Sequence, residues 1–160
     1  MNKFTNSIYD ISIDSIDGEL IELKDYKGKY ILFVNVASYC GYTKQYSDLQ
    51  KLQDTYHNLQ VIGIPCNQFL FQEPFSEKKI KKFCTLNYGI NFLMTKKIKV
   101  KGKFQHKIYK WLTSRDLNGL KESRVKWNFQ KYLVDKNGQL IDFFSSQTSP
   151  LSTKITQHLI

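Results

Sequence analysis

The chain has 160 residues, of which 41% are hydrophobic and 24% charged, and its formal net charge is +10. This length suits a single domain, residues 1–160, with a hydrophobic core of its own. No apolar run approaches the ~20 residues that cross a bilayer, and the N-terminal stretch lacks the apolar core of a secretory signal. We therefore expect a cytoplasmic protein with no stable membrane insertion.

The excess positive charge comes almost entirely from lysines, with Arg115 and Arg124 as the only arginines. The lysines are spread along the chain and are not interleaved with aromatic residues as in RNA-binding motifs. We interpret them as a solvated surface and expect no nucleic-acid partner. The alternative is a basic module that binds nucleic acid or an anionic membrane, which salt-dependent binding without enzymatic activity would support.

The first half of the chain predicts a strand–helix–strand unit behind a hairpin. Residues 8–23 alternate around an Asp17-Gly18 turn signal and indicate a β-hairpin. Residues 30–36 and 59–64 are short apolar runs typical of buried parallel strands. Apolar residues at helical spacing between them predict a helix over about 43–57.

The second half predicts a shorter alternation of elements. Ser76 can cap a helix that runs to about residue 86, with Ile80 and Phe83 facing inward. The remaining expected elements are an extended segment at 92–100, a helix at 105–114, strands at 125–134 and 140–144 and a helix at 150–160. This order indicates one α/β domain with a mixed sheet.

Three cysteines occur, Cys40, Cys66 and Cys84. Their spacing contains neither a C-x-x-C pair nor a zinc-type Cys/His pair, so we expect no disulfide scaffold, no metal and no cofactor. Cys40 follows the 30–36 strand and lies at or just before the next predicted helix. Unpaired N–H groups and the helix dipole at such a position favour a thiolate.

Several motifs in order and spacing resemble the glutathione peroxidases, in the branch that uses cysteine in place of selenocysteine. They are NVASYCG-T at 35–43, IPCNQF at 64–69, QEP at 72–74, NYGINF at 87–92 and KWNFQKYLVDKNG at 126–138. The resemblance runs from about residue 7 to the C-terminus. It implies a thioredoxin-like fold, with a central mixed sheet flanked by helices and an N-terminal β-hairpin. It also implies reduction of hydrogen peroxide and of organic or lipid hydroperoxides with thiol electrons.

Residue by residue, the resemblance implies that Cys40 attacks the peroxide and that Gln72, Trp127 and Asn128 complete the catalytic group. These three side chains are neutral N–H donors, which can stabilise a thiolate and a leaving oxygen without titrating themselves. The FCxLNYG context implies that Cys84 resolves the oxidised Cys40 as a disulfide, which requires the 76–86 helix to unwind. For Cys66 we expect a structural role.

Two departures from the family pattern concern loops. Leu93 replaces a typical proline, and Phe75 replaces a glycine after QEP, where a positive φ would be awkward for phenylalanine. The short segment between Leu112 and Trp127 resembles the monomeric members. Together with Cys84, it favours thioredoxin over glutathione as the reductant.

Three other functions compete with this interpretation. A glutathione-dependent peroxidase would use the same site with another reductant. A sensor that passes oxidation to a partner protein would use the same residues, and only trapping of that partner separates it from the enzyme. A general thiol–disulfide oxidoreductase would need C-x-x-C, whereas Thr43 occupies the fourth position here.

Overall fold

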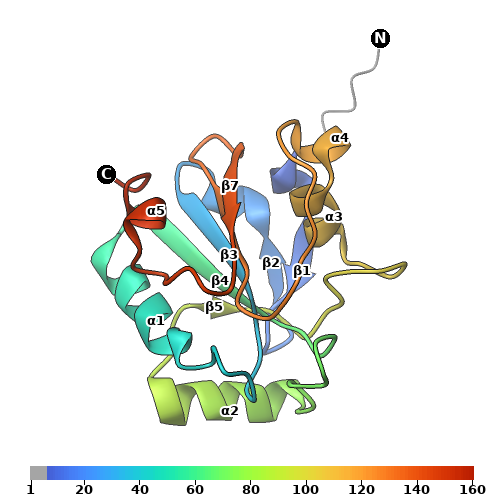
Figure 1. Ribbon diagram of the computed structural model, residues 1–160, viewed down its shortest axis with the longest axis vertical. Coiled ribbons are helices and arrows are strands. Elements are labelled where there is room, and N and C mark those ends of the chain that lie inside the picture. The colour runs from blue at the N-terminus through green and yellow to red at the C-terminus, as the bar shows by residue number, and fades with distance from the viewer. Residues whose placement is uncertain (1–6) are drawn as a thin grey trace.

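A mixed five-stranded sheet forms the centre of the computed structural model, which describes residues 7–160 (Figure 1). Its strand order is β5-β4-β3-β6-β7. The strands are β3 (Tyr30–Val36), β4 (Leu59–Pro65), β5 (Leu93–Met94), β6 (Lys131–Val134) and β7 (Leu140–Phe144). Pairs β3–β4 and β4–β5 are parallel, and pairs β3–β6 and β6–β7 are antiparallel. The predicted mixed sheet is therefore confirmed.

The predicted strand–helix–strand unit forms the centre of this sheet. β3 and β4 pair over their full length, from Tyr30 opposite Leu59 to Val36 opposite Pro65, and α1 (Gln45–Thr55) connects them. Because the two strands are parallel and in register, the loops that follow them leave the same edge of the sheet (Figure 1).

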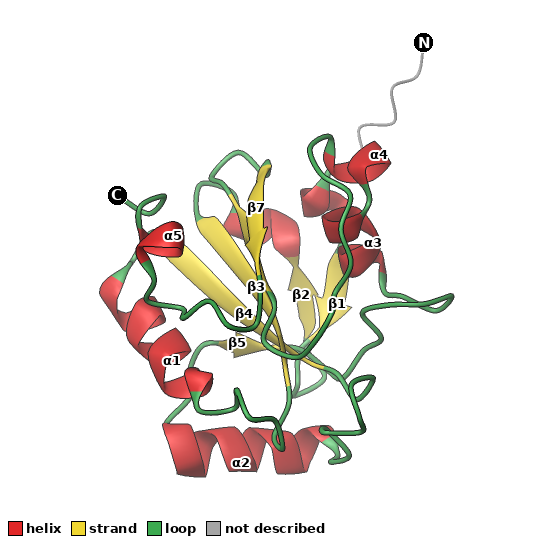
Figure 2. Cartoon of the chain, in the orientation of Figure 1, coloured by secondary structure: helices red, strands yellow, loops and turns green. Residues whose placement is uncertain are grey.

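Alternation along β3 divides the core between the two faces of the sheet. Ile31 and Phe33 pack against one cluster, and Leu32 and Val34 pack against the other. The elements on the first face are β1 (Ser12–Asp14), β2 (Leu20–Glu22), α3 (Lys107–Thr113) and α4 (Arg115–Asn118) (Figure 2). Those on the second face are α1, α2 (Glu77–Tyr88) and α5 (Thr153–Thr156).

The N-terminal hairpin is confirmed, and short helices flank it. β1 and β2 pair antiparallel, and Gly18 occupies their turn at φ 87°, a backbone conformation that glycine adopts without strain. The 3-10 helices η1 (Ile8–Asp10) and η2 (Leu23–Tyr26) were not predicted, because each is too short to produce a periodic pattern.

Three predicted elements are shorter in the structure than the pattern suggested. The 125–134 strand is only Lys131–Val134, since Phe129 turns the chain with φ 64°. Only Leu93 and Met94 of the 92–100 segment pair as a strand, and the C-terminal helix is only Thr153–Thr156. In each case the apolar residues at the expected spacing are buried, but part of the chain that carries them is a loop and not a helix or strand.

Helix α2 begins and ends as its sequence predicts, and it buries Cys84 in addition to the expected Ile80. The Ser76 side chain accepts a hydrogen bond from the Lys79 N–H, and Gly89 ends the helix in the left-handed conformation. Ile80 and Cys84 are buried, and the partly buried Phe83 packs against the same core cluster, so the expected inward positions of Ile80 and Phe83 agree with the structure. Over the described residues, no helix is both long enough and apolar enough to span a membrane.

Candidate active site

Cys40 lies in a tight turn between β3 and α1, half-buried and unbonded to another cysteine. The Thr43 hydroxyl closes this turn, because it donates to the Ala37 carbonyl at 2.7 Å and accepts from the Cys40 N–H at 3.0 Å. The Tyr42 N–H points at the Cys40 Sγ, 3.3 Å away. A backbone amide is thus aimed at the sulfur, where it can stabilise a thiolate.

The helix expected directly after Cys40 starts later than predicted. α1 begins at Gln45, and residues 41–44 form turns with i to i+3 hydrogen bonds, such as the 3.1 Å bond from the Thr43 N–H to the Cys40 carbonyl. Cys40 thus lies just before the helix, as expected, but a turn separates the thiol from the first helical residue. The donor aimed at the sulfur is the Tyr42 amide of the preceding turn.

The structure brings two of the predicted donors, Gln72 and Asn128, into direct contact. The Asn128 Nδ2 donates to the Gln72 Oε1 at 3.0 Å, and the Tyr39 N–H donates to the Gln72 carbonyl at 3.0 Å. The first bond uses the oxygen of the Gln72 amide, so its NH₂ group remains available as a donor. The second bond ties the backbone of Gln72 to the residue before Cys40.

Trp127 and Asn128 lie in a turn before β6 and not in a strand. The Phe129 N–H donates to the Asn35 carbonyl at 2.6 Å, and the Asn35 Nδ2 donates to the Trp127 carbonyl at 3.0 Å. This buried Asn35 side chain on β3 thus holds the turn against the strand that leads to Cys40. The half-buried Trp127 ring packs on Phe69, with ring centroids 5.6 Å apart.

Glu73 is a buried carboxyl at the site that the sequence did not single out. Its Oε1 accepts a hydrogen bond from the Ser38 hydroxyl at 3.0 Å, and its Oε2 is buried without a partner among the described residues. Burial raises the pKa of Glu73 to about 7, and the Ser38 hydrogen bonds and Lys97 oppose the rise. Its only sequence signal is its place between Gln72 and Pro74.

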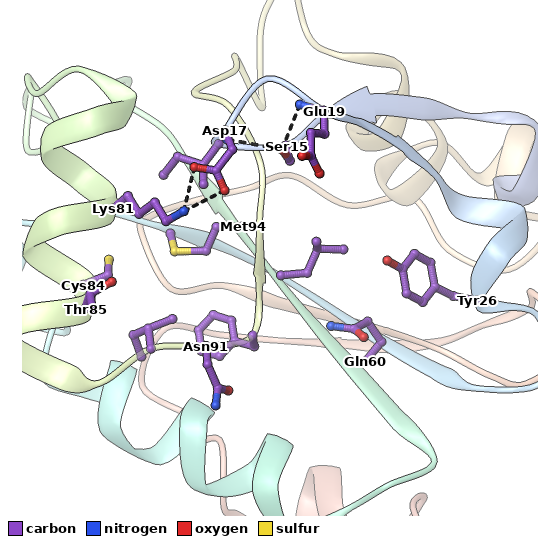
Figure 3. A pocket seen from close by; sticks show the side chains of 14 residues that line it. Ser15, Asp17, Glu19, Tyr26, Gln60, Lys81, Cys84, Thr85, Asn91 and Met94 are labelled. Atoms are coloured by element: carbon purple, nitrogen blue, oxygen red, sulfur yellow. Dashed lines mark hydrogen bonds and ion pairs between the residues drawn. The ribbon is translucent and has the colours of Figure 1, made fainter.

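Cys84 is the remaining functional candidate, and the fold holds it away from solvent. It lies on the inner face of α2, 1% exposed, and lines a cavity of about 400 Å³ between α2, the hairpin and β5 (Figure 3). Burial raises the pKa of Cys84 to about 11, with a further rise from Glu73 against an opposing effect of Tyr46. At neutral pH this thiol is protonated and inert in the folded helix.

An exposed ion pair connects α2 to the hairpin above this cavity. The Lys81 Nζ lies 2.7 Å from the Asp17 Oδ1, and Figure 3 shows the pair at the rim near Cys84. Both side chains are about half exposed, at 53% and 52%, so the pair contributes no more than ~1 kcal/mol. This ion pair therefore adds little to the attachment of α2 to the hairpin.

Two other buried polar side chains, Cys66 and Lys131, make no hydrogen bond to Cys40, Gln72 or the Asn128 side chain. Cys66 is fully buried, its Sγ lies 3.5 Å from the Gln68 Oε1, and burial raises its pKa, which fits the expected structural role. Lys131 is fully buried, and its ammonium donates to the Gln45 Oε1 and to the carbonyls of Ser146 and Thr148. Burial lowers the pKa of Lys131 to about 7.

No group of three or more histidine, cysteine, aspartate or glutamate side chains within residues 7–160 could hold a metal ion. The arrangement instead combines a half-exposed thiol, an amide hydrogen bond to its sulfur and a pair of oriented side-chain amides. Such a set suits attack by sulfur on a small electrophile whose leaving group gains negative charge.

The model of the glutathione peroxidase family matches residues 8–113, more than half of the chain. A "glutathione peroxidase-like peroxiredoxin 2" of Saccharomyces cerevisiae is 44% identical and covers 92% of this chain and 93% of its own length. The "hydroperoxy fatty acid reductase gpx1" of Synechocystis is 39% identical over 91% of this chain and 90% of its own length. The crystal structure of GPX1 from T. cruzi superposes with a TM-score of 0.74 at 29% identity, covering 96% and 94%.

Proposed function

Because the chain belongs to the glutathione peroxidase family, has its thioredoxin-like fold and is a peroxidase, we propose that Cys40 is its peroxide-attacking residue. In this step the Cys40 thiolate attacks one oxygen of a hydroperoxide, and the O–O bond breaks. The sulfur is oxidised by two electrons to a sulfenic acid, and the second oxygen leaves as an alkoxide or hydroxide that is then protonated. The products are an alcohol, or water when hydrogen peroxide is the substrate.

Gln72, Trp127 and Asn128 are the groups we assign to the leaving oxygen and the thiolate. The observation that carries this assignment is the hydrogen bond from Asn128 to the Gln72 Oε1, because it leaves the Gln72 NH₂ as a donor beside the turn that holds Cys40. Each donor of this type contributes about 2–4 kcal/mol to an oxyanion-like transition state. The test is Gln72→Glu, which keeps the shape and the acceptor of Gln72, removes its donor and adds a negative charge; single-turnover oxidation by peroxide should slow.

We assign the second step to Cys84. Its thiol attacks the Cys40 sulfenic sulfur, an S–S bond forms, and the departing hydroxide takes the thiol proton and becomes water. The buried and protonated Cys84 cannot do this within the folded helix, so α2 must open locally. A dithiol protein of the thioredoxin type then reduces the disulfide and restores both thiols.

The choice of reductant can be measured directly. Peroxide consumption is followed with thioredoxin and separately with glutathione, on the wild type and on Cys84→Ser. We expect turnover with thioredoxin to fall at least tenfold in Cys84→Ser, while a single turnover still oxidises Cys40. Equal thioredoxin turnover in the two proteins would eliminate Cys84 as the resolving thiol.

Mass spectrometry of the oxidised protein tests the disulfide itself. After one equivalent of peroxide we expect a Cys40–Cys84 bond, and Cys66→Ser serves as the control that leaves this bond intact. A bond between Cys40 and Cys66 alone would contradict the assignment.

We also propose that the protein works as a monomeric single domain in the cytoplasm. The sequence supports this proposal only by its three widely spaced cysteines, which form no recognisable disulfide framework. Light scattering of the reduced and oxidised protein measures the oligomeric state.

A further inference from the structure

The turn before β6 carries two of the assigned donors, Trp127 and Asn128, and its backbone is strained. Phe129 holds a φ of 64°, in the left-handed region that residues with a side chain seldom adopt. Such a conformation persists only where the surrounding structure imposes it, and it is concentrated at functional sites. Contacts from outside the turn must therefore hold the peptide between Asn128 and Phe129 in place.

Hydrogen bonds hold this peptide at both of its ends. The Phe129 N–H donates to the Asn35 carbonyl on β3 at 2.6 Å, and the Ser146 hydroxyl donates to the Asn128 carbonyl at 2.6 Å. Because the carbonyl and the N–H of one trans peptide point in opposite directions, the two bonds together fix the orientation of its plane. Without the Ser146 bond the plane can rotate, which gives the strain at Phe129 a route to relax.

The orientation of this peptide decides where the Asn128 side chain points. Asn128 is fully buried, and its Nδ2 donates to the Gln72 Oε1 at 3.0 Å. Its own Oδ1 is buried without a hydrogen-bond partner among the described residues. One hydrogen bond of the side chain therefore sets its direction, and the backbone must supply the remaining constraint.

Ser146 lies in the segment that joins β7 to α5 (Figure 1), and a buried ammonium holds it there. The Ser146 carbonyl accepts from the Lys131 Nζ at 3.2 Å and from the Gln45 Nε2 at 2.7 Å. Lys131 also donates to the Gln45 Oε1 at 2.6 Å and to the Thr148 carbonyl. None of these acceptors is a carboxylate, and Lys131 forms no ion pair with any described residue. A buried charge without a counter-ion is costly, so these oxygens must stay aligned on the ammonium to offset that cost.

Gln45 connects the same ammonium to the turn that holds Cys40. It is the first residue of α1, and its N–H donates to the Tyr42 carbonyl at 2.8 Å. The N–H of Tyr42 is the donor aimed at the Cys40 sulfur. Two short chains of hydrogen bonds thus run from Lys131, one to the Cys40 turn and one through Ser146 to the Asn128 turn.

We propose that Ser146 is a positioning residue for the peroxide step, which orients the Asn128 amide through the backbone, and that Lys131 fixes Ser146 in place. Ser146 bonds to a backbone carbonyl and not to a reacting atom, so it acts only through Asn128. The proposal therefore rests on the function proposed above for Asn128. It adds to the site a residue that lies outside the motifs that resemble the family.

A kinetic double-mutant cycle tests whether Ser146 acts through Asn128. Single-turnover oxidation of the reduced full-length protein by hydrogen peroxide is followed by stopped-flow fluorescence for the wild type, S146A, N128A and S146A/N128A. Ser146→Ala removes only the hydroxyl and leaves the anchored carbonyl, so this variant is expected to fold. The control S123A removes a serine hydroxyl that lies 2.8 Å from the Tyr132 hydroxyl and outside the site.

We expect S146A to slow oxidation about fivefold and N128A about a hundredfold. In the N128A background the additional loss of the Ser146 hydroxyl changes the rate less than about twofold, and S123A stays within about twofold of the wild type. An unchanged rate in S146A beside a slowed N128A would overturn the proposal. So would equal slowing by S146A in both backgrounds, or equal slowing in S123A, because the hydroxyl would then act on stability in general.

The side-chain amide of Asn128 gives a second measurement that does not depend on turnover. Its pair of N–H signals in a proton–nitrogen NMR spectrum is identified by its absence in N128A. We expect this pair to shift in S146A, in Lys131→Gln and in the milder Gln45→Ala, and to stay in place in S123A. An unmoved pair in S146A would refute the positioning role, and an unmoved pair in both anchor variants would remove Lys131 from it.

The two measurements also separate this proposal from the function on which it rests. A wild-type oxidation rate in N128A would refute the assigned role of Asn128 in the reaction. The NMR signals would still decide whether Ser146 orients the Asn128 amide, since they are recorded without peroxide.

Discussion

Replacing Glu73 by glutamine should remove the contribution of this carboxyl to the pH dependence of folding stability between about pH 5 and about pH 8. The wild-type carboxyl is fully buried, with one oxygen bonded to the Ser38 hydroxyl and the other without a partner among the described residues. Glutamine keeps the size and the acceptor for Ser38, but it cannot ionise. The substitution therefore isolates the cost of a buried carboxylate charge.

The magnitude follows from the two pKa values of Glu73. Its pKa is 4.5 as an unperturbed group and about 7 in the fold, because burial disfavours the charged form. The unfolded chain therefore binds fewer protons in this window, and stability falls as pH rises from 4.5 towards 7 and is constant above it. The part of this loss between about pH 5 and about pH 8 amounts to about 2.5 kcal/mol.

Urea unfolding of the wild type, Glu73→Gln and Glu19→Gln at the two pH values measures this difference. Glu19 is exposed and serves as the matched control for loss of one carboxyl. We expect the stability of Glu73→Gln relative to the wild type to improve by about 2.5 kcal/mol on going from the lower to the higher pH. Parallel pH profiles for all three proteins would refute a buried, ionising Glu73.

Three further substitutions test contacts that hold the site and its frame. Thr43→Val removes the hydroxyl that holds the Cys40 N–H, so the single-turnover rate with peroxide should fall about tenfold in stopped-flow fluorescence; an unchanged rate would exclude this role. Lys131→Met leaves a cluster of buried acceptors without their donor and should cost about 3 kcal/mol in urea unfolding, whereas a stabilised variant would contradict the hydrogen-bonded ammonium. Gly138→Ala would place a Cβ 2.6 Å from the Tyr9 ring at φ 79° and should cost about 2 kcal/mol in thermal unfolding, and an unaltered melting temperature would show that this contact relaxes freely.

The sheet could be predicted from the sequence because its strands are continuous apolar runs with clear ends. Tyr30–Val36 and Leu59–Pro65 match the predicted ranges within one residue, and the hairpin follows from its Asp-Gly turn. The turn at Phe129 could not be predicted, because phenylalanine rarely holds a positive φ and its N–H bonds to Asn35, far away in sequence. The predicted strand, 125–134, therefore begins six residues before the observed one.

The turn at Phe75 was expected to differ from the family pattern, and Phe75 indeed has no positive φ, whereas the left-handed Leu70 and Phe71 were not expected. The doubt raised by Phe75 concerned a turn that needs a positive φ, but within residues 7–160 the left-handed non-glycine residues are Leu70, Phe71 and Phe129. Phe75 instead packs its ring on Tyr39, with centroids 5.2 Å apart. Nothing local to residue 75 distinguishes these conformations, since the loop is set by contacts between distant segments.

The residues of the candidate site could be predicted from the sequence, but their hydrogen bonds and ionisation could not. Cys40, Gln72, Trp127, Asn128 and Cys84 came from motifs, and their catalytic roles stay predictions until the variants above are measured. The orientation of the Gln72 amide depends on a partner 56 positions away, and the ionisation of Glu73 depends on burial; neither has a local signal. Sequence motifs identify such residues but do not show which atoms remain available as donors.

The exposed ion pair between Lys81 and Asp17 makes the two halves of the cycle respond differently to ionic strength. Dissolved ions screen this half-exposed pair, which joins α2 to the hairpin, and so make it easier for the helix to release Cys84. The donors assigned to Cys40 are neutral amides and an indole, which screening barely affects. If Cys84 resolves Cys40 as proposed, we expect added salt to speed this resetting step modestly and to leave the first reaction with peroxide nearly unchanged.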